Sequence, residues 1–239
     1  MDNFNSKMDK KINDFVLKNH LTPDENKFSA ITDGLVNPKT YFASKYKILW
    51  ILKEPYDEIE ISEEGGIPCG GGWSAAGNLA NYDKISENYA NKTYNRIANT
   101  TYCILNNLKR FESKISEEDA YKMFLSIGIM NVSKMPNLTL SDNSYIQKQY
   151  EIWKPILLEQ IQLYNPDILI FGNTFSCFRK DIFTNEEITK QQVIDQRAFL
   201  RNKKLYLNWY HPCYFAMSDS DYINPLLDDI NSNLVWFNL

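Results

Sequence analysis

Four short, mostly apolar runs stand out along the chain, and each predicts a β-strand. They occupy residues 48–52, 127–132, 168–172 and 205–209. Short apolar runs without a polar alternation are typical of strands that are buried on both faces, as in parallel sheets. The pattern therefore predicts a central sheet of four mainly parallel strands.

Amphipathic segments lie between these runs and predict helices. Ser74 and Ser116 are suitable N-cap residues, and the acidic residues after Ser116 suit the first turn of a helix. The apolar segment 234–237 is expected to pack against the rest of the protein. Helices are expected at about 5–20, 74–82, 92–111, 116–127, 145–164, 173–182 and 221–232.

The alternation of apolar strands with helices predicts an α/β protein. We expect a three-layer α/β/α sandwich around a central, mainly parallel four-stranded sheet. A single domain would span residues 1–239, with an N-terminal helical extension at about 1–45.

Composition narrows the class of protein. The chain has 239 residues, of which 44% are hydrophobic and 23% charged, enough to bury a substantial core. It has neither a membrane-length apolar run nor an apolar signal-peptide core, so a cytoplasmic protein without a membrane partner is expected. We also expect a monomer. The net charge of −4 does not favour nucleic acid as a partner, although it leaves room for a local basic face.

Cysteine spacing argues against a metal or disulfide framework. The four cysteines are widely separated and no pair forms a CxxC motif. Free thiols and no bound metal are therefore expected.

The stretch 48–77 combines a predicted strand, a long loop expected from Lys53 to about Trp73, and the richest concentration of glycine in the chain. Six of the nine glycines lie between Gly65 and Gly77, shortly after Glu54 ends the strand region. Polar residues after the carboxyl ends of parallel strands are where α/β proteins place ligands. The stretch therefore predicts one part of a binding site.

Polar side chains also follow two other predicted strands, namely Asn131 and His211. Glutamate can act as an acid or base, asparagine can pair with an amide-like ligand, and histidine can donate a hydrogen bond. Taken singly, a surface Glu54, a turn-forming Asn131 and a structural His211 are the commoner interpretations. Their shared position at strand ends favours one common site.

Four blocks in this order resemble the uracil-DNA glycosylase superfamily, most closely its iron–sulfur-bearing bacterial and archaeal branch. Segment 48–56 resembles the strand and loop of motif one, and 66–71 with 76–77 resembles the glycine loop. Segment 131–136 resembles the N-V-x-K-x-x-P block, and 210–214 resembles the His-Pro-Ser loop of motif two. The resemblance covers residues 46–216 and includes the helix, Pro-Asp turn and strand of 157–172.

The sequence departs from the family pattern at five positions. Leu52 replaces the first glycine of motif one, and Lys53 replaces an acid or glutamine. Cys69 stands where a base-stacking phenylalanine is expected, and Cys213 replaces the motif-two serine. Met135 occupies the position of a cluster cysteine, so no iron–sulfur cluster and no other cofactor are expected.

The resemblance implies a DNA glycosylase of base-excision repair. Such an enzyme flips uracil or a modified pyrimidine out of single- or double-stranded DNA and hydrolyses its N-glycosidic bond. Glu54 would position or deprotonate the attacking water, and His211 would donate to the pyrimidine O2 as charge develops there. Asn131 would pair with the N3–H and O4 edge of the base.

The resemblance also implies further contacts. Tyr56, Cys69 and Trp73 would line the base pocket. Tyr214 or Phe215 would be pushed into the duplex. Contacts to DNA would come from Gly70, Gly71, Ser133, Lys134, Cys213, Tyr214 and Phe215.

Two alternatives stay open. A catalytically weak or inactive member of the superfamily would bind nucleic acid or a modified base, because Lys53 could neutralise Glu54. Hydrolysis of a small nucleoside or nucleotide at the same site would show little salt dependence, whereas DNA binding weakens steeply with salt.

Overall fold

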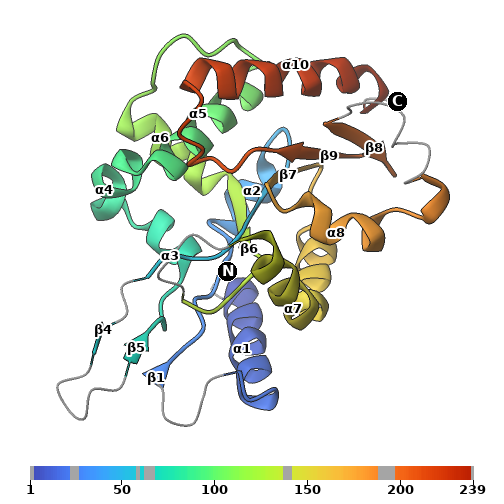
Figure 1. Cartoon of the computed structure of the whole chain (residues 1–239). Coiled ribbons are helices and arrows are strands. Elements are labelled where there is room, and N and C mark those ends of the chain that lie inside the picture. The colour runs from blue at the N-terminus through green and yellow to red at the C-terminus, as the bar shows by residue number, and fades with distance from the viewer. Residues whose placement is uncertain are drawn as a thin grey trace.

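A six-stranded sheet forms the centre of the molecule (Figure 1), with strand order β2-β6-β3-β7-β9-β8. The computed structural model describes residues 3–21, 27–57, 60–61, 68–136, 142–187 and 197–237. The four inner strands run parallel to one another: β3 (Ile48–Leu52), β6 (Ile127–Asn131), β7 (Ile168–Gly172) and β9 (Lys204–Trp209).

The prediction of four strands is corrected to six. The four inner strands lie where the apolar runs predict them, but β2 (Gly34–Leu35) and β8 (Ala198–Arg201) add antiparallel edges. β2 has only two residues, and β8 exposes part of its side chains. β2 is buried but too short to form an apolar run that predicts a strand, and it contains a glycine. β8 is partly open to solvent, as is usual for an edge strand, so it lacks the continuous apolar run of a central strand.

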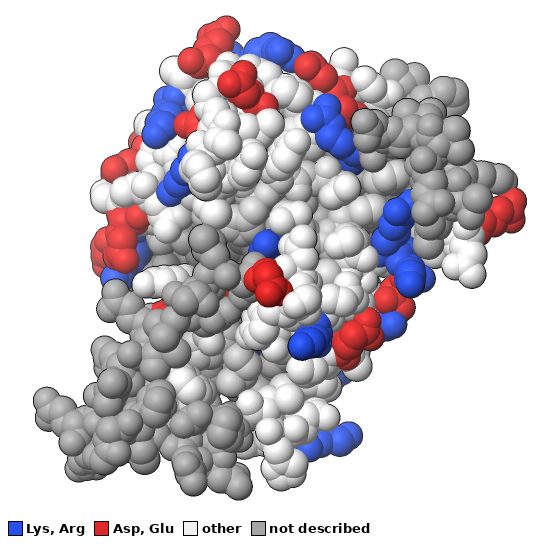
Figure 2. Space-filling view, in the orientation of Figure 1, with Lys and Arg blue, Asp and Glu red and all other residues white. Residues whose placement is uncertain are grey.

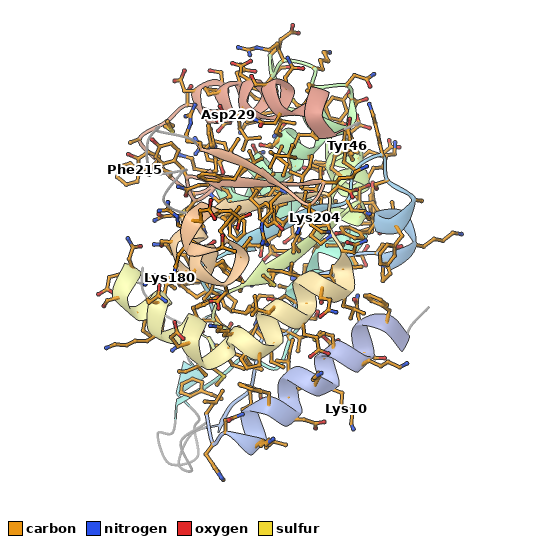
Figure 3. All side chains as sticks on the ribbon, turned by 90° about the vertical axis from the view of Figure 1, so that its right-hand side faces the viewer. Lys10, Tyr46, Lys180, Lys204, Phe215 and Asp229 are labelled. Carbon is orange, nitrogen blue, oxygen red and sulfur yellow. The ribbon has the colours of Figure 1, made fainter. Side chains whose placement is uncertain are left out.

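Helices cover both faces of the sheet. Ile48, Trp50 and Leu52 point into one hydrophobic cluster, while Leu49 and Ile51 point into the other. Figure 3 shows α10 on one side of the sheet and α7 with α1 on the other. The first cluster includes residues of α5 (Lys92–Leu105), α6 (Glu117–Leu125) and α10 (Asp219–Phe237), and the second includes residues of α1 (Asn3–Lys18), α7 (Asn143–Tyr164) and α8 (Phe175–Ile182).

Most predicted helices are present, with shifted ends. Ser74 caps α3 (Ala75–Ala80) and Ser116 caps α6, each accepting a backbone N–H bond of 3.1 Å. The helix predicted over 92–111 ends at Leu105, because Asn107 and Leu108 adopt positive φ angles of 59° and 58°. The segment 234–237 belongs to α10 rather than forming a separate tail.

Several short elements were not predicted. α2 (Pro38–Ala43), η1 (Tyr82–Lys84) and α4 (Ile85–Ala90) contain at most six residues each, too few to show helical periodicity. The N-terminal region is part of the main body, since α1 packs in the second cluster and β2 joins the sheet.

A small second sheet lies at one end of the molecule (Figure 1). It has the order β1-β5-β4, formed by β1 (Lys27–Phe28), β5 (Pro68–Gly70) and β4 (Glu60–Ile61). The sequence predicts a long loop over 53–73, so β4 and β5 correct that expectation where the chain is described.

Within the described ranges, no helix is long and apolar enough to cross a membrane.

Candidate functional site

The ends of β3 and β6 lie side by side. Leu52 pairs in register with Asn131, and beyond the strands Val132 N–H donates to Leu52 O over 2.9 Å. Ser133 N–H then donates to Lys53 O, also over 2.9 Å. The polar segment that carries Lys53 and Glu54 therefore continues alongside the segment that follows Asn131.

Gly172, at the end of β7, is where the β3 end and the His211 loop approach each other. A Cβ atom at Gly172 would lie 3.1 Å from Leu52 Cδ2 and 3.2 Å from Pro212 Cδ. It would also lie 3.5 Å from His211 Cα. The absence of a side chain at Gly172 leaves room for this close approach. Because β3, β6, β7 and β9 run parallel, the segments bearing Glu54, Asn131 and His211 follow strand ends at one edge of the sheet.

His211 is held as a neutral imidazole. Its Nδ1 accepts the backbone N–H of Cys213 over 3.3 Å and lies 3.0 Å from Cys213 Sγ. Burial of the imidazole, and secondly the charge of Lys53, lower the pKa of His211 to about 4. Because a backbone N–H can only donate, Nδ1 is the acceptor nitrogen and Nε2 carries the proton near neutral pH.

The N-terminal part of α7 borders Glu54. Burial raises the pKa of the Tyr145 hydroxyl, a hydrogen bond with Ser133 opposes that shift, and the charge of Glu54 adds to it. Ser133 Oγ also donates to Gln149 Oε1 over 3.2 Å. Tyr145 was not predicted as a site residue, since its position fits the pattern of an ordinary amphipathic helix.

Lys134 lies in the protein interior, not on a DNA-facing surface. Its Nζ donates to both carboxylate oxygens of Asp33, at 2.7 and 2.6 Å, and both side chains are fully buried. Gln160 Nε2 and the Asn131 backbone N–H donate to the same carboxylate over 2.9 and 2.6 Å. Ser133 is buried too. The phosphate contact expected of Lys134 does not fit this position.

The glycines of the loop are packed against the protein's own backbone. Gly71 has φ of 81°, and a Cβ there would lie 1.9 Å from Ser29 O. Its N–H donates to Asp57 Oδ2 over 2.6 Å, and Gly70 O accepts from Ser29 N–H over 2.9 Å. The close approach that requires glycine at position 71 is therefore to Ser29, and the Gly71 N–H already has a partner within the protein.

The remaining base-binding candidates are less closely assembled. Tyr56 is 67% exposed and Trp73 is half-buried. Trp73 O accepts from Thr32 N–H over 3.0 Å. Cys69 lies in β5, with a side chain outside the described part of the structure.

Exposed aromatic rings lie on both sides of the His-Pro pair in the sequence. Tyr210 and Tyr214 stack with centroids 5.2 Å apart and an interplanar angle of 10°. Phe215 lies 6.1 Å from Tyr214 and is 85% exposed, at the periphery of the view in Figure 3. Cys213, which directly precedes Tyr214, is half-buried and forms no disulfide.

The loop also has a buried partner that the sequence does not reveal. Arg96, on α5, is 1% exposed and donates to Pro212 O over 3.0 Å and to Tyr214 O over 2.6 Å. Its Nε donates to Asp219 Oδ1 over 2.7 Å. No spacing or composition signal distinguishes Arg96 from a surface arginine.

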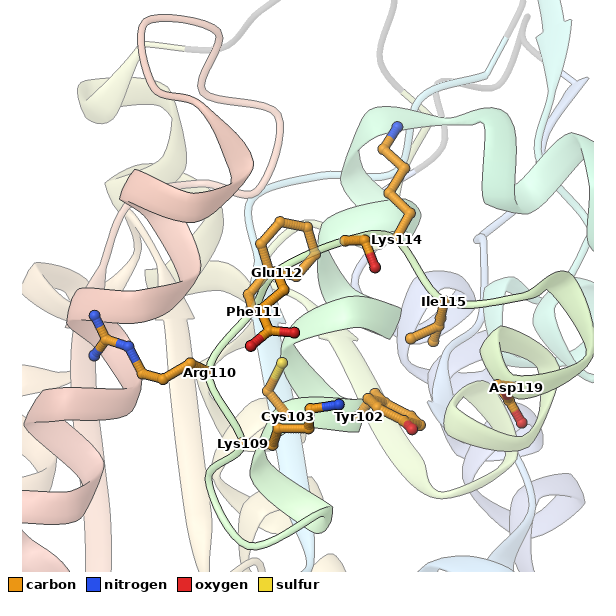
Figure 4. A pocket seen from close by; sticks show the side chains of 10 residues that line it. Tyr102, Cys103, Lys109, Arg110, Phe111, Glu112, Lys114, Ile115 and Asp119 are labelled. Carbon is orange, nitrogen blue, oxygen red and sulfur yellow. The ribbon is translucent and has the colours of Figure 1, made fainter.

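A separate hollow of about 200 Å³ lies between α5 and the segment leading to α6 (Figure 4). Tyr102, Cys103, Lys109 and Glu112 are among its lining residues. It contains none of the predicted site residues.

Among the described residues, no group of three or more His, Cys, Asp or Glu side chains is arranged to hold a metal ion.

Basic and acidic side chains are interspersed on the face shown in Figure 2, mostly toward its outline. The coloured part of that face has no large area of a single charge, in keeping with a net charge of −4.

A search of protein-family models finds no match to this chain, and neither does a search of curated proteins.

Proposed function

We propose that the chain is a DNA glycosylase that hydrolyses the N-glycosidic bond of uracil or a modified pyrimidine flipped out of DNA. The observation that carries the proposal is the neutral His211, held by Cys213 at the same sheet edge as Glu54 and Asn131. The helices on both sheet faces support an α/β/α sandwich as the scaffold.

His211 would act on the leaving base. As the bond between C1′ and the base nitrogen breaks, its electron pair moves to the base and negative charge develops on O2. A neutral imidazole that keeps its proton on Nε2 can donate to that oxygen without carrying a charge that must first be desolvated. A preorganised donor of this kind contributes about 3 kcal/mol, or about a hundredfold in rate.

Glu54 would act on the sugar and the water. Its negative charge favours an oxocarbenium-like C1′, and the carboxylate can accept a proton from the water that attacks there. The charge of Glu54 helps to raise the pKa of the Tyr145 hydroxyl, which therefore lies near the carboxylate. As a protonated donor near neutral pH, this hydroxyl can help to orient that water. Asn131 offers an amide that matches the base edge.

Binding to DNA would depend on the exposed aromatic rings. Tyr214 and Phe215 lie three and four residues after His211, and both side chains are exposed. An apolar ring inserted into the base stack would compensate for the flipped base. The net charge of −4, the interior position of Lys134 and the interspersed surface charges favour modest affinity that weakens as salt rises.

One observation favours a second candidate, a binding protein without turnover. The charge of Lys53 is close enough to His211 to lower its pKa, and Lys53 directly precedes Glu54. A cation there can offset the carboxylate charge on which the oxocarbenium mechanism depends.

The test is incubation with uracil-containing single- and double-stranded DNA, and a panel of modified pyrimidines, followed by alkaline cleavage of abasic sites. The expected result is cleavage by the native protein and a large loss for Glu54→Gln. Glu159→Gln is the matched control, because Glu159 is an exposed α7 residue paired with Lys11. No abasic sites on any substrate would refute the enzyme proposal. Tight binding that is unchanged by Glu54→Gln would favour the binding protein.

A further inference from the structure

The loop that carries His211 is anchored from beneath by one buried side chain. Arg96 donates from Nη1 to Pro212 O and Tyr214 O, and from Nη2 to Met217 O. Its Nε donates to Asp219 Oδ1 over 2.7 Å. One guanidinium therefore binds three carbonyl groups of the loop and the first residue of α10.

The environment of Arg96 suits a permanently charged, planar donor. The guanidinium carbon lies 4.8 Å from the centroid of the Tyr222 ring, a cation–π contact. The Tyr222 hydroxyl donates to Tyr210 O over 2.8 Å and so fixes the start of the loop. A lysine at position 96 has a compact ammonium and does not reproduce the fork geometry that reaches all these acceptors.

The anchored carbonyls are close to the contact that orients His211. Pro212 and Tyr214 flank Cys213, whose backbone N–H donates to His211 Nδ1. Without Arg96 these carbonyls would lose buried partners, and each unsatisfied buried group favours rearrangement. The ring of Tyr214 stacks on Tyr210 of the same loop, and the side chain of Phe215 is 85% exposed.

We propose that Arg96 is a positioning residue that holds the 210–218 loop so that Cys213 N–H faces His211 Nδ1 and the imidazole proton stays on Nε2. The same anchor presents Tyr214 and Phe215 together at the surface. The effect on imidazole geometry is independent of any reaction, whereas an effect on base release rests on the proposed glycosylase function.

The test is nitrogen-15 NMR of the imidazole rings across a pH titration. The chain has only two histidines, so His20, exposed at the end of α1, serves as an internal reference. In the native protein, His211 should show an unprotonated Nδ1 and titrate near the pKa of about 4 that burial and Lys53 give it. In Arg96→Gln the expected result is a mixture of tautomers and a pKa moved toward the ordinary 6.5 of free histidine.

Matched variants separate this effect from general destabilisation. Arg110→Gln is the control, because Arg110 also joins the α5 region to α10, through Asp228, without contacting the 210–218 loop. Arg96→Lys and Tyr222→Phe remove only part of the anchor and carry the test if Arg96→Gln does not fold, as judged by circular dichroism. Intermediate shifts of the His211 signals are expected in both.

Folded Arg96 variants whose His211 tautomer and titration match the native protein would overturn the assignment. If the native protein releases a base, single-turnover rates at saturating DNA should fall in Arg96→Lys by more than DNA affinity does. If the NMR changes occur but the native protein releases no base, the positioning role stands and the proposed glycosylase function fails.

Discussion

Replacing Lys134 with methionine should destabilise the protein strongly. The substitution removes the ammonium that contacts both Asp33 oxygens at 2.7 and 2.6 Å, in a pair with no exposed side-chain surface. The Asp33 carboxylate would keep Gln160 Nε2 and the Asn131 N–H, but no cation. Removing one partner of a buried ion pair costs about 3–5 kcal/mol, so we expect a loss of that size in the free energy of unfolding.

Urea denaturation at pH 7 measures this loss, and two further variants interpret it. Lys154→Met breaks a partly exposed pair with Asp181 and should cost about 0–1 kcal/mol. The double variant Asp33→Asn with Lys134→Met removes both charges, so it should recover a large part of the loss through a coupling of the two sites. A Lys134→Met protein within about 1 kcal/mol of the native protein would refute a buried, structural ion pair.

If the protein binds DNA, Lys134→Met also tests whether the Lys134 ammonium contacts a phosphate. A lysine that neutralises one phosphate contributes about 0.9 to the slope of log affinity against log salt concentration. An interior Lys134 predicts that folded Lys134→Met keeps the native slope. A slope reduced by about 0.9 would place its ammonium on phosphate.

Two other substitutions test the local geometry. Gly71→Ala puts a Cβ 1.9 Å from Ser29 O at a φ of 81°. The substitution should therefore lower the free energy of unfolding by about 1–3 kcal/mol or more, and with it the midpoint of thermal unfolding. A midpoint equal to that of the native protein would contradict the close approach. His211 has a folded pKa of about 4 against about 6.5 in the unfolded chain, so the unfolded chain binds the proton first and stability falls as pH decreases from 6.5 toward 4. Between pH 7.5 and 5, protonation of His211 in the unfolded chain should lower the free energy of unfolding of the native protein by about 1–2 kcal/mol more than that of His211→Asn. Urea unfolding of both proteins measures this difference. Equal losses in the two proteins would contradict the depressed pKa.

The central strands and the edge where they end could be predicted because their signal is local. The runs around Trp50 and Ile170 are short and apolar at every position, as is typical of a strand that is buried on both faces. The carboxyl ends of parallel strands then meet at one edge by geometry, which accounts for the convergence of the Glu54, Asn131 and His211 segments.

The features that escaped prediction depend on contacts between distant parts of the chain. Lys134 pairs with Asp33, 101 residues earlier, and Arg96 binds a loop more than a hundred residues later. No sequence spacing reports such partners, and an interior lysine is indistinguishable from a surface one by pattern. The glycines were singled out for a close approach to nucleic acid, whereas Gly71 and Gly72 lie close to Ser29 of the protein itself.

The most direct test of the proposed function is release of free base from uracil-containing DNA under single-turnover conditions, with protein in excess. The native protein should convert the substrate, Glu54→Gln should lose most of the rate at unchanged DNA affinity, and Glu159→Gln should match the native protein. No free base from uracil or any modified pyrimidine tested, by native protein that is folded and binds the DNA, would contradict a glycosylase site at this sheet edge.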